Sequence, residues 1–455
     1  MSARSSRPAA QTFGRGGIHP ESRKELTAGR RIEDLPPPQE VRLPLLQHLG
    51  EPAVPIVKKG DIVRRGQKIA DGGPTGVPLH ATISGRVKPV ERYPHPTLVM
   101  SQAIVIVRQE GEDPGELEFA EDPGWRGCSR AEMLARIKEA GIVGLGGAAF
   151  PTYRKLTLPE GVKVDTLLVN GAECEPFLTS DYRLMVSRPD DVVEGSLVMA
   201  QLVGVSRIQI GVEADKLDAA RMLGRAATRV PHEGISVDVV PVVTRYPQGA
   251  ERQLVQAVTG RAMRPRTLPY SVGVVVQNVA TAAAVHDAVR FRRPLLDRIV
   301  TVTGPGVVTP KNVRVPLGTL LSDLVAFCGG LTSQATRVVA GGPMMGRALP
   351  RLDLPVIKGL NGLVLLTGRG PFEEGFGPCI QCGRCLEACP LGLEPDQIAL
   401  RVEAGRPLET ERFGTLDCYE CGSCTYVCPA GRPLVQFIQV AKSTLRRAIA
   451  QKVAP

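Results

Sequence analysis

Short apolar runs that end in polar residues recur through the middle of the chain, and helical stretches lie between them. The runs cover residues 165–170, 208–213, 239–243 and 273–278. An amphipathic pattern over residues 130–140 precedes the first run. Apolar strands that alternate with helices are typical of a parallel sheet covered on both faces. The pattern therefore predicts a doubly wound α/β domain.

Polar side chains follow these apolar runs. Asn170, Glu173 and Glu175 follow the first, and Gln277 and Asn278 close the last. Taken singly, each is more often a surface or capping residue. Because α/β sheets bind ligands at the carboxyl ends of their strands, the group as a whole favours a nucleotide-like ligand there.

A glycine-rich loop lies between the helical stretch 130–140 and the first strand. It reads GLGGAAFPT from Gly144 to Thr152, with Lys155 one turn further. It contains G-x-G-x-x-A, but a dinucleotide fingerprint should follow a strand, and here a helix precedes it. Two interpretations stay open: the loop amides hold a phosphate that Lys155 neutralises, or the loop is a turn without a ligand.

Eight of the eleven cysteines form two matching runs near the C-terminus. Both runs have the spacing C-x2-C-x2-C-x3-C-P, which is typical of proteins with two [4Fe-4S] clusters, where the fourth cysteine of each run ligates the other cluster. We therefore expect one cluster on Cys379, Cys382, Cys385 and Cys428, and the other on Cys418, Cys421, Cys424 and Cys389.

Other uses of these cysteines fit the spacing less well. Disulfides are not expected in a reducing cytoplasm, and structural zinc uses separated pairs of cysteines. Cys128, Cys174 and Cys328 are left over, and we expect them to be small buried side chains. Two neighbouring clusters conduct electrons, so the remainder of the chain should hold a source or a sink.

Composition and charge limit the expected cellular location and the expected partners. The 455 residues carry a net charge of +10, include no apolar run long enough to span a membrane, and begin with a polar, basic stretch unlike a signal peptide. We expect a cytoplasmic protein. The charge serves solubility or attracts an acidic partner such as a ferredoxin or an anionic lipid surface, and without a basic stripe interleaved with aromatics a nucleic acid is the least supported partner.

Four segments in combination resemble the RnfC component of the Rnf electron-transport complex and, more distantly, the NADH-oxidising flavin component of respiratory complex I. They are GLGGAAFPT with Lys155, VNGAECEPFLTSDYR, YPQGAE and VVQNVAT. The resemblance implies a site for FMN and NAD(H). The implied residues are Gly144, Gly146, Gly147, Lys155, Asn170, Glu173, Glu175, Gly249, Glu251, Asn278 and Thr281. One departure is Ala149, where the related loops carry glycine and where alanine disfavours a positive φ.

The flanking regions resemble the same Rnf component. Residues 42–112 are similar to a barrel-sandwich hybrid of the lipoyl type without an attachment lysine, and we expect a docking module in which His80 lies in a turn. We expect Met344 and Met345 to pack in a core. The expected regions are an N-terminal extension (1–41), the barrel-sandwich hybrid (42–112), an FMN- and NADH-binding α/β domain (125–295), a β-grasp, SLBB-like domain (296–368), a ferredoxin-like domain with two clusters (369–440) and a basic tail (441–455) whose helix packs on the ferredoxin-like domain.

The resemblance implies an enzyme component that passes electrons between NAD(H), FMN and the two clusters. It would sit peripherally on the cytoplasmic face of the membrane, with the other subunits of an Rnf-type complex, and possibly ferredoxin, as partners. Two alternatives remain. One is a soluble flavin and iron–sulfur cobalamin reductase of a microcompartment, in which the barrel-sandwich part would come late. The other is a non-catalytic electron-transfer adaptor, for which Ala149 would be the sign.

Overall fold

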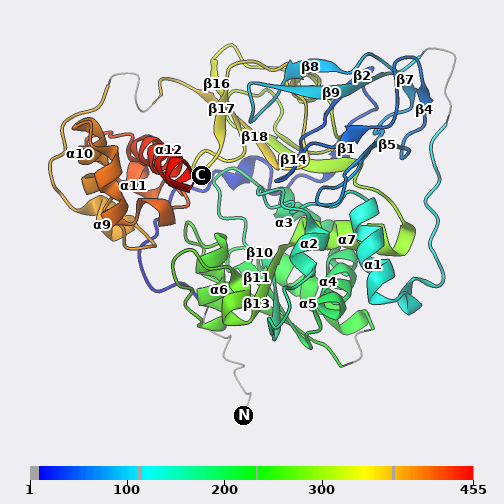
Figure 1. Ribbon diagram of the computed structural model, residues 1–455, viewed down its shortest axis with the longest axis horizontal. Helices are drawn as coiled ribbons and strands as arrows, with labels where there is room; N and C mark the ends of the chain where they lie inside the picture. The colour runs from blue at the N-terminus through cyan, green and yellow to red at the C-terminus, as the bar shows by residue number, and fades with distance from the viewer. Residues whose placement is uncertain (1–9, 110–114, 232–233, 371–374, 454–455) are drawn as a thin grey trace.

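The chain folds into four regions that follow one another along the sequence. The computed structural model describes residues 10–109, 115–231, 234–370 and 375–453. Figure 1 shows a β-rich region in blue, a three-layer α/β domain in green, a second β-rich region in yellow and a helical C-terminal unit in orange and red. This arrangement confirms the predicted multidomain α/β fold.

The α/β domain contains one parallel sheet of four strands. They are β10 (Thr166–Gly171), β11 (Arg207–Glu213), β12 (Ser236–Val242) and β13 (Val274–Asn278), in the order β12-β11-β10-β13. The chain adds β11 and β12 on one side of β10 and then returns to add β13 on the other side. The carboxyl ends of β10 and β13 therefore form the switch point at which such sheets bind ligands.

Helices cover both faces of this sheet. They are α1 (Arg130–Glu139), α2 (Thr152–Leu156), α3 (Ser180–Ser187), α4 (Pro189–Val203), α5 (Leu217–Arg229), α6 (Glu251–Thr259) and α7 (Val279–Phe291). Leu167 and Val169 of β10 belong to the main core with α4, α5 and α7, whereas Leu168 packs with Leu254 and Val258 of α6. Because both faces are buried, the strands read as continuous apolar runs.

The first β-rich region consists of two small sheets. Its strands are β2 (Glu40–Pro44), β3 (Val54–Pro55), β4 (Ile62–Val63), β5 (Lys68–Asp71), β6 (Leu79–His80), β7 (Gly85–Val87), β8 (Glu91–Pro94) and β9 (Met100–Val107). The expectation of a turn at His80 is wrong, since this residue lies buried in β6, where burial lowers its pKa to about 3.

The second β-rich region is a six-stranded sheet with one helix. It comprises β14 (Asp297–Thr303), β15 (Lys311–Pro316), α8 (Leu321–Phe327), β16 (Ala335–Ala340), β17 (Arg347–Leu349) and β18 (Gly362–Thr367). The sixth strand, β1 (Ile32–Asp34), comes from the N-terminal extension and pairs in parallel with β15 at the sheet edge. The extension is thus built into a domain far along the chain.

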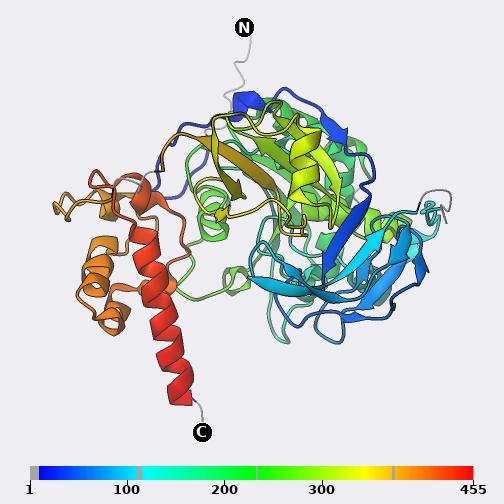
Figure 2. The same cartoon turned by 90° about the horizontal axis from the view of Figure 1, so that it is seen from above.

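The C-terminal unit is helical. It contains α9 (Arg384–Ala388), α10 (Pro395–Glu403), α11 (Ser423–Tyr426) and α12 (Leu434–Val453), with short 3-10 turns at Pro407–Phe413 and Thr415–Asp417. Leu434, Ile438 and Ala441 of α12 are buried together with Ile398 of α10, so the helix predicted in the tail does pack on this unit. Figure 2 shows α12 in red running along the unit toward the C-terminus. Among the described residues, no helix has the length and apolarity needed to cross a membrane.

Candidate cofactor sites

The glycine-rich loop lies at the switch point of the parallel sheet. Asn170 and Asn278 are paired across β10 and β13, and a side chain at Gly146 would lie 3.3 Å from Cβ of Asn278. The amide of Leu145 donates to Oγ1 of Thr281 at 2.9 Å. Asn278 accepts from the amides of Ala280 and Thr281 at the start of α7. The loop is therefore fixed directly above the ends of the two strands.

The YPQGAE segment closes the other side of the site. Nδ2 of Asn170 donates to the carbonyl of Gly249 at 2.8 Å, and Nζ of Lys155 lies 2.7 Å from Oε1 of Glu251. Gly249 leaves no room for a side chain, because a Cβ would lie 2.3 Å from the carbonyl oxygen of Ala172. The structure thus brings together expected residues from four separate segments. They are Gly144, Gly146, Gly147, Lys155, Asn170, Gly249, Glu251, Asn278 and Thr281.

Glu173 and Glu175, the two acids that follow β10, form hydrogen bonds away from the glycine-rich loop. Glu173 accepts from Oγ of Ser180 and from two amides in the first turn of α3. Glu175 accepts from the amides of Met344 and Met345, at 3.1 and 2.8 Å, and burial raises its pKa to about 7. Glu173 therefore fixes the start of α3 within the α/β domain, and Glu175 joins this domain to the Met344 segment.

Sequence reasoning missed several buried polar groups near the strand ends. Both carboxylate oxygens of Glu213 are buried without a hydrogen-bond partner, and burial raises its pKa to about 7. Nε2 atoms of Gln248 and Gln277 are also buried and unpartnered. Asp181 accepts from Nδ2 of Asn278 at 2.6 Å, and burial raises its pKa. Glu213 is the last residue of β11, two positions beyond Gly211, which pairs with Asn170 of β10, and this place at a strand end is the signal that was available.

These features fit a polar, phosphate-bearing cofactor. Gly147 has a φ of +110° and open space where a side chain would stand, so its backbone is free for close approach by a ligand. Unpartnered buried polar groups call for a hydrogen-bonding occupant. Ala149 adopts a φ of +49°, so the alanine takes up the left-handed conformation that a glycine would adopt more easily, at a cost of about 1 kcal/mol.

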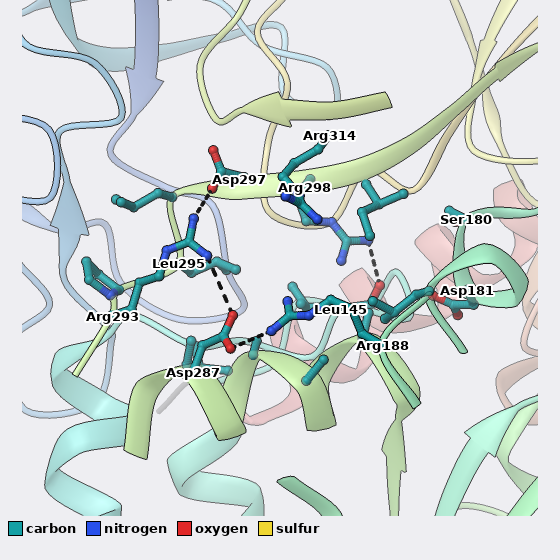
Figure 3. Close-up of a pocket in the computed structure, with 18 residues that line it drawn as sticks. Leu145, Ser180, Asp181, Arg188, Asp287, Arg293, Leu295, Asp297, Arg298 and Arg314 are labelled. Atoms are coloured by element: carbon teal, nitrogen blue, oxygen red, sulfur yellow. Dashed lines mark hydrogen bonds and ion pairs between the residues drawn. The ribbon is translucent and has the colours of Figure 1, made fainter. Parts of the chain in front are cut away.

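A small cavity of about 70 Å³ lies beneath the glycine-rich loop. Figure 3 shows that its charged side chains point toward one another, with Arg188 paired to Asp287 and Arg293 to Asp297. Arg298 of β14 is buried and donates to the carbonyls of Leu145 and Leu360, and burial lowers its pKa to about 10. These groups already satisfy one another, so the cavity belongs to the support that β14 gives the loop.

The two cysteine runs adopt the same backbone path. In the first run, Gln381 and Gly383 have φ values of +54° and +75°. In the second, Glu420 and Gly422 have φ values of +63° and +83°. A short helix, α9 or α11, follows in each case. These shared left-handed residues turn the backbone in each cysteine run between its first and third cysteines.

Cys389 of the first run lies against the second run. Burial, followed by the charges of Cys421 and Cys389, raises the pKa of Cys418 to about 12, and Cys389 raises the pKa of Cys421 and Cys424 as well. Burial, together with the charge of Cys379, raises the pKa of Cys385 to about 11. The described residues hold no group of three or more His, Cys, Asp or Glu side chains suited to a single metal ion.

The second run faces the α/β domain. The hydroxyl of Tyr419 donates to Oε1 of Gln253 at 2.9 Å, and Arg266 pairs with Asp417 at 2.9 Å. Met344 packs with Cys421 in a small apolar cluster. Met345 is 51% exposed, so the predicted core position is wrong for that residue. In the first run, Cys382 is exposed.

The three remaining cysteines differ in burial. Cys328 is buried, as expected, whereas Cys128 is partly exposed. Cys174 accepts a hydrogen bond from the amide of Gly249 at 3.3 Å and packs beside Cys421 and Met344. It therefore lies between the segment that carries Gly249 and Glu251 and the second cysteine run.

Four family models match the chain in succession. They are the RnfC barrel sandwich hybrid domain over residues 12–111, the Nuo51 FMN-binding domain over 137–287, the SLBB domain over 299–348 and the 4Fe-4S dicluster domain over 378–432. The barrel-sandwich domain comes first along this chain, whereas it would come late in a cobalamin reductase, so the order of the domains disfavours that alternative. These matches leave the exact domain boundaries and the individual site residues as predictions.

Curated relatives, each the C component of its complex, match over nearly the whole chain. That of the "proton-translocating ferredoxin:NAD(+) oxidoreductase complex" of Clostridium ljungdahlii is 43% identical over 95% of this chain and 94% of its own length. That of the "ion-translocating oxidoreductase complex" of Rhodobacter capsulatus is 44% identical over 96% and 84%. That of the "Na(+)-translocating ferredoxin:NAD(+) oxidoreductase complex" of Acetobacterium woodii is 41% identical over 96% and 97%.

A solved structure shares the fold. An NAD+-reducing [NiFe]-hydrogenase in the air-oxidized state superposes with a TM-score of 0.53 and 20% identity, over 73% of this chain and 68% of the hydrogenase chain. At this identity the likeness concerns the fold alone.

Proposed function

Because this chain belongs to the RnfC family of the ion-translocating oxidoreductase complexes, we propose that it passes electrons between NAD(H), FMN and two [4Fe-4S] clusters. The observation that carries the proposal is the contact between the second cysteine run and the YPQGAE segment: the hydroxyl of Tyr246 donates to the carbonyl of Cys421 at 2.6 Å, and Cys421 packs on the apolar cluster that contains Tyr246. A nucleotide-type site and an electron carrier then meet inside one chain.

The residues at the switch point bind and orient the flavin. Amides of the loop around Gly146 and Gly147 would hold its phosphate, and Lys155 would supply positive charge beside it. Asn170 and Asn278 fix the loop and the YPQGAE segment in one orientation. Bound FMN supplies the chemistry that accepts a hydride from NADH and releases electrons singly, while the protein contributes position and electrostatics. Glu173 and Glu175 act by holding α3 and the Met344 segment at the edge of the site.

The contacts also suggest an order for the two clusters. The cluster on Cys418, Cys421, Cys424 and Cys389 lies next to the α/β domain, and we call it the inner cluster. The cluster on Cys379, Cys382, Cys385 and Cys428 has an exposed ligand, and we call it the outer cluster. With both clusters bound, the second run would hold the cluster that takes electrons from the flavin side, and the first run, with its exposed Cys382, would hold the cluster that a partner protein can approach.

The partners follow from the family. We place the chain with the other subunits of a membrane complex, peripherally and on the cytoplasmic face, as the family resemblance implies. None of its described helices is suited to crossing a membrane. Ferredoxin is the further partner that the names of the relatives suggest. A net charge of +10 favours association with an acidic electron carrier or with an anionic membrane surface.

Reduction of the flavin in reconstituted protein tests the function. The protein is loaded with FMN and iron under anaerobic conditions, and NADH is added while flavin absorbance is followed. We expect the flavin band to bleach before the clusters become reduced. The proposal fails if the flavin stays oxidised while both clusters are intact, a result that would favour the non-catalytic adaptor.

A matched pair of lysine variants tests the flavin site. Lys155→Ala should lower FMN content at least tenfold, because the phosphate loses its positive partner. Lys163→Ala changes an exposed lysine in the same domain and should retain FMN. Equal FMN content in the two variants would contradict the assignment of Lys155.

A further inference from the structure

A short N-terminal segment, Gln11–Ile18, lies between the α/β domain and the ferredoxin-like unit. Gln11 is bridged to Val242 at the end of β12, and Ile18 is bridged to Tyr246. On its other side the amide of Gly17 donates to the carbonyl of Ala388 at 2.9 Å. The segment therefore connects two domains that are far apart in sequence.

The segment touches the backbone of a proposed cluster ligand. A Cβ built on Gly16 would lie 2.5 Å from both the carbonyl carbon and the carbonyl oxygen of Cys389, and Gly16 has a φ of +67°. No residue with a side chain fits there without moving Cys389. The backbone thus passes so close to Cys389 that only a glycine is accommodated there.

Tyr246 makes the corresponding contact with the second run. It is 2% exposed, and its hydroxyl donates to the carbonyl of Cys421 at 2.6 Å. Its backbone exchanges two hydrogen bonds with Ile18, at 2.8 and 2.9 Å. Its ring packs with Ile18, Ala388 and Met344. One side chain thereby joins the YPQGAE segment, the N-terminal segment and the second run.

We propose that Gln11–Ile18 and Tyr246 form a clamp that positions the inner cluster against the flavin segment, with Tyr246 as its positioning residue. The clamp contacts the ligand-bearing backbone on two sides, at Ala388 and Cys389 through Gly17 and Gly16 and at Cys421 through the hydroxyl of Tyr246. These two cysteines come from different runs, so the clamp also fixes the runs relative to each other. The inference rests on the proposed function for the identity of the electron donor. The contacts of the clamp with Cys389 and Cys421 do not depend on that function.

The Tyr246→Phe variant removes the hydroxyl and keeps the ring. The hydroxyl proton is the positive end of a bond that points at a ligand residue, and its removal makes the added electron less well stabilised. We expect the inner cluster to remain, with its midpoint potential shifted downward, and the outer cluster to keep its potential. EPR-monitored titration with dithionite and mediators measures both potentials without NADH or FMN.

Two further variants assign the EPR signals to the clusters and control for the loss of a tyrosine hydroxyl. Cys421→Ser removes the inner cluster, so the EPR component missing in that variant marks it. Tyr426→Phe makes the same chemical change at a residue that is 54% exposed in the same cysteine run, and it should leave both potentials unchanged. Unchanged potentials in Tyr246→Phe, or a shift confined to the outer cluster, would overturn the proposal.

Gly16→Ala tests the other arm of the clamp. The added methyl must displace Cys389, so we expect loss of the inner cluster and retention of the outer one, seen by iron content and EPR. Retention of both clusters with unchanged potentials contradicts the clamp, as does selective loss of the outer cluster. Failure of NADH to reduce the flavin in unmodified protein would contradict the proposed function. The measurements on the clusters would still test the clamp.

Discussion

The two cysteine runs share their spacing and their backbone path, yet their surroundings differ. At Gly383 of the first run, no described residue other than its two chain neighbours comes within 4 Å of the position where a side chain would begin. The corresponding position at Gly422 lies 2.8 Å from the carbonyl oxygen of Met344. Ile380 is 63% exposed, whereas Tyr419, at the equivalent place, bonds to Gln253 of α6. One motif thus occurs once at the surface and once at a domain junction.

This difference teaches that ligand spacing and cluster role are set by separate parts of the sequence. Cysteine spacing determines which cluster can bind, while hydrogen bonds and solvent access set its potential. Equivalent positions in the two runs provide matched pairs of variants. Each pair asks whether the environment, and not the motif, separates the two clusters.

The largest effect is expected for the crossing cysteines. Cys428→Ala should abolish the outer cluster and Cys389→Ala the inner one, because each cluster loses its fourth ligand to a change in the other run. Iron content and EPR of the purified variants measure this. Cys128→Ala, outside both runs, is the control and should keep both clusters. If Cys428→Ala removes only the cluster of its own run, the crossing assignment is wrong.

The glycine pair should differ clearly in stability. Gly422→Ala combines a positive φ with a contact at Met344, and we expect a loss of about 3 kcal/mol in the free energy of unfolding. Gly383→Ala has the positive φ alone and should lose about 1 kcal/mol. Anaerobic urea unfolding compares the two. Equal losses would mean that the junction does not constrain the second run.

A smaller difference is expected between Tyr419 and Ile380. Tyr419→Ala removes a packed ring and the bond to Gln253, for a loss of about 2 kcal/mol. Ile380→Ala, on the exposed side, should change stability by less than about 0.5 kcal/mol. Thermal unfolding of the iron-loaded proteins measures both. A greater loss for Ile380→Ala would reverse our view of which run is buried.

The smallest effect belongs to the ion pair between Arg266 and Asp417. Its arginine side chain is 57% exposed, so Arg266→Ala should cost less than about 1 kcal/mol, and the cost should shrink as salt is added. Unfolding midpoints at low and high ionic strength test this. A large, salt-independent loss would show that the pair does more than tether the junction.

Sequence reasoning predicted the regions that periodicity and spacing encode. The apolar runs indicated β10, β11, β12 and β13, and the cysteine spacing indicated two clusters. It also predicted the convergence of Asn170, Asn278 and the glycine-rich loop, because strand ends meet at one edge of a parallel sheet. Placement of Glu173 and Glu175 was harder, since the amides that engage them belong to α3 and to the Met344 segment.

Contacts between distant segments could not be predicted. Arg298 gives no local sign that it supports the carbonyl of Leu145, and Glu213 is visible as an unpaired acid only when its surroundings are known. His80 has the same difficulty, because a strand of two residues leaves no periodic pattern. Tertiary context decides these positions, and one sequence does not record it.

The N-terminal extension has a consequence for biosynthesis. Its residues leave the ribosome well before their partners Val242, Asn312 and Ala388, which lie more than 200 positions further along the chain. Contacts across such separations form late in folding. The segment at Gly16 can reach its place only after the backbone at Cys389 has been made and has reached its final path. This early part of the chain is thus among the last to be fixed.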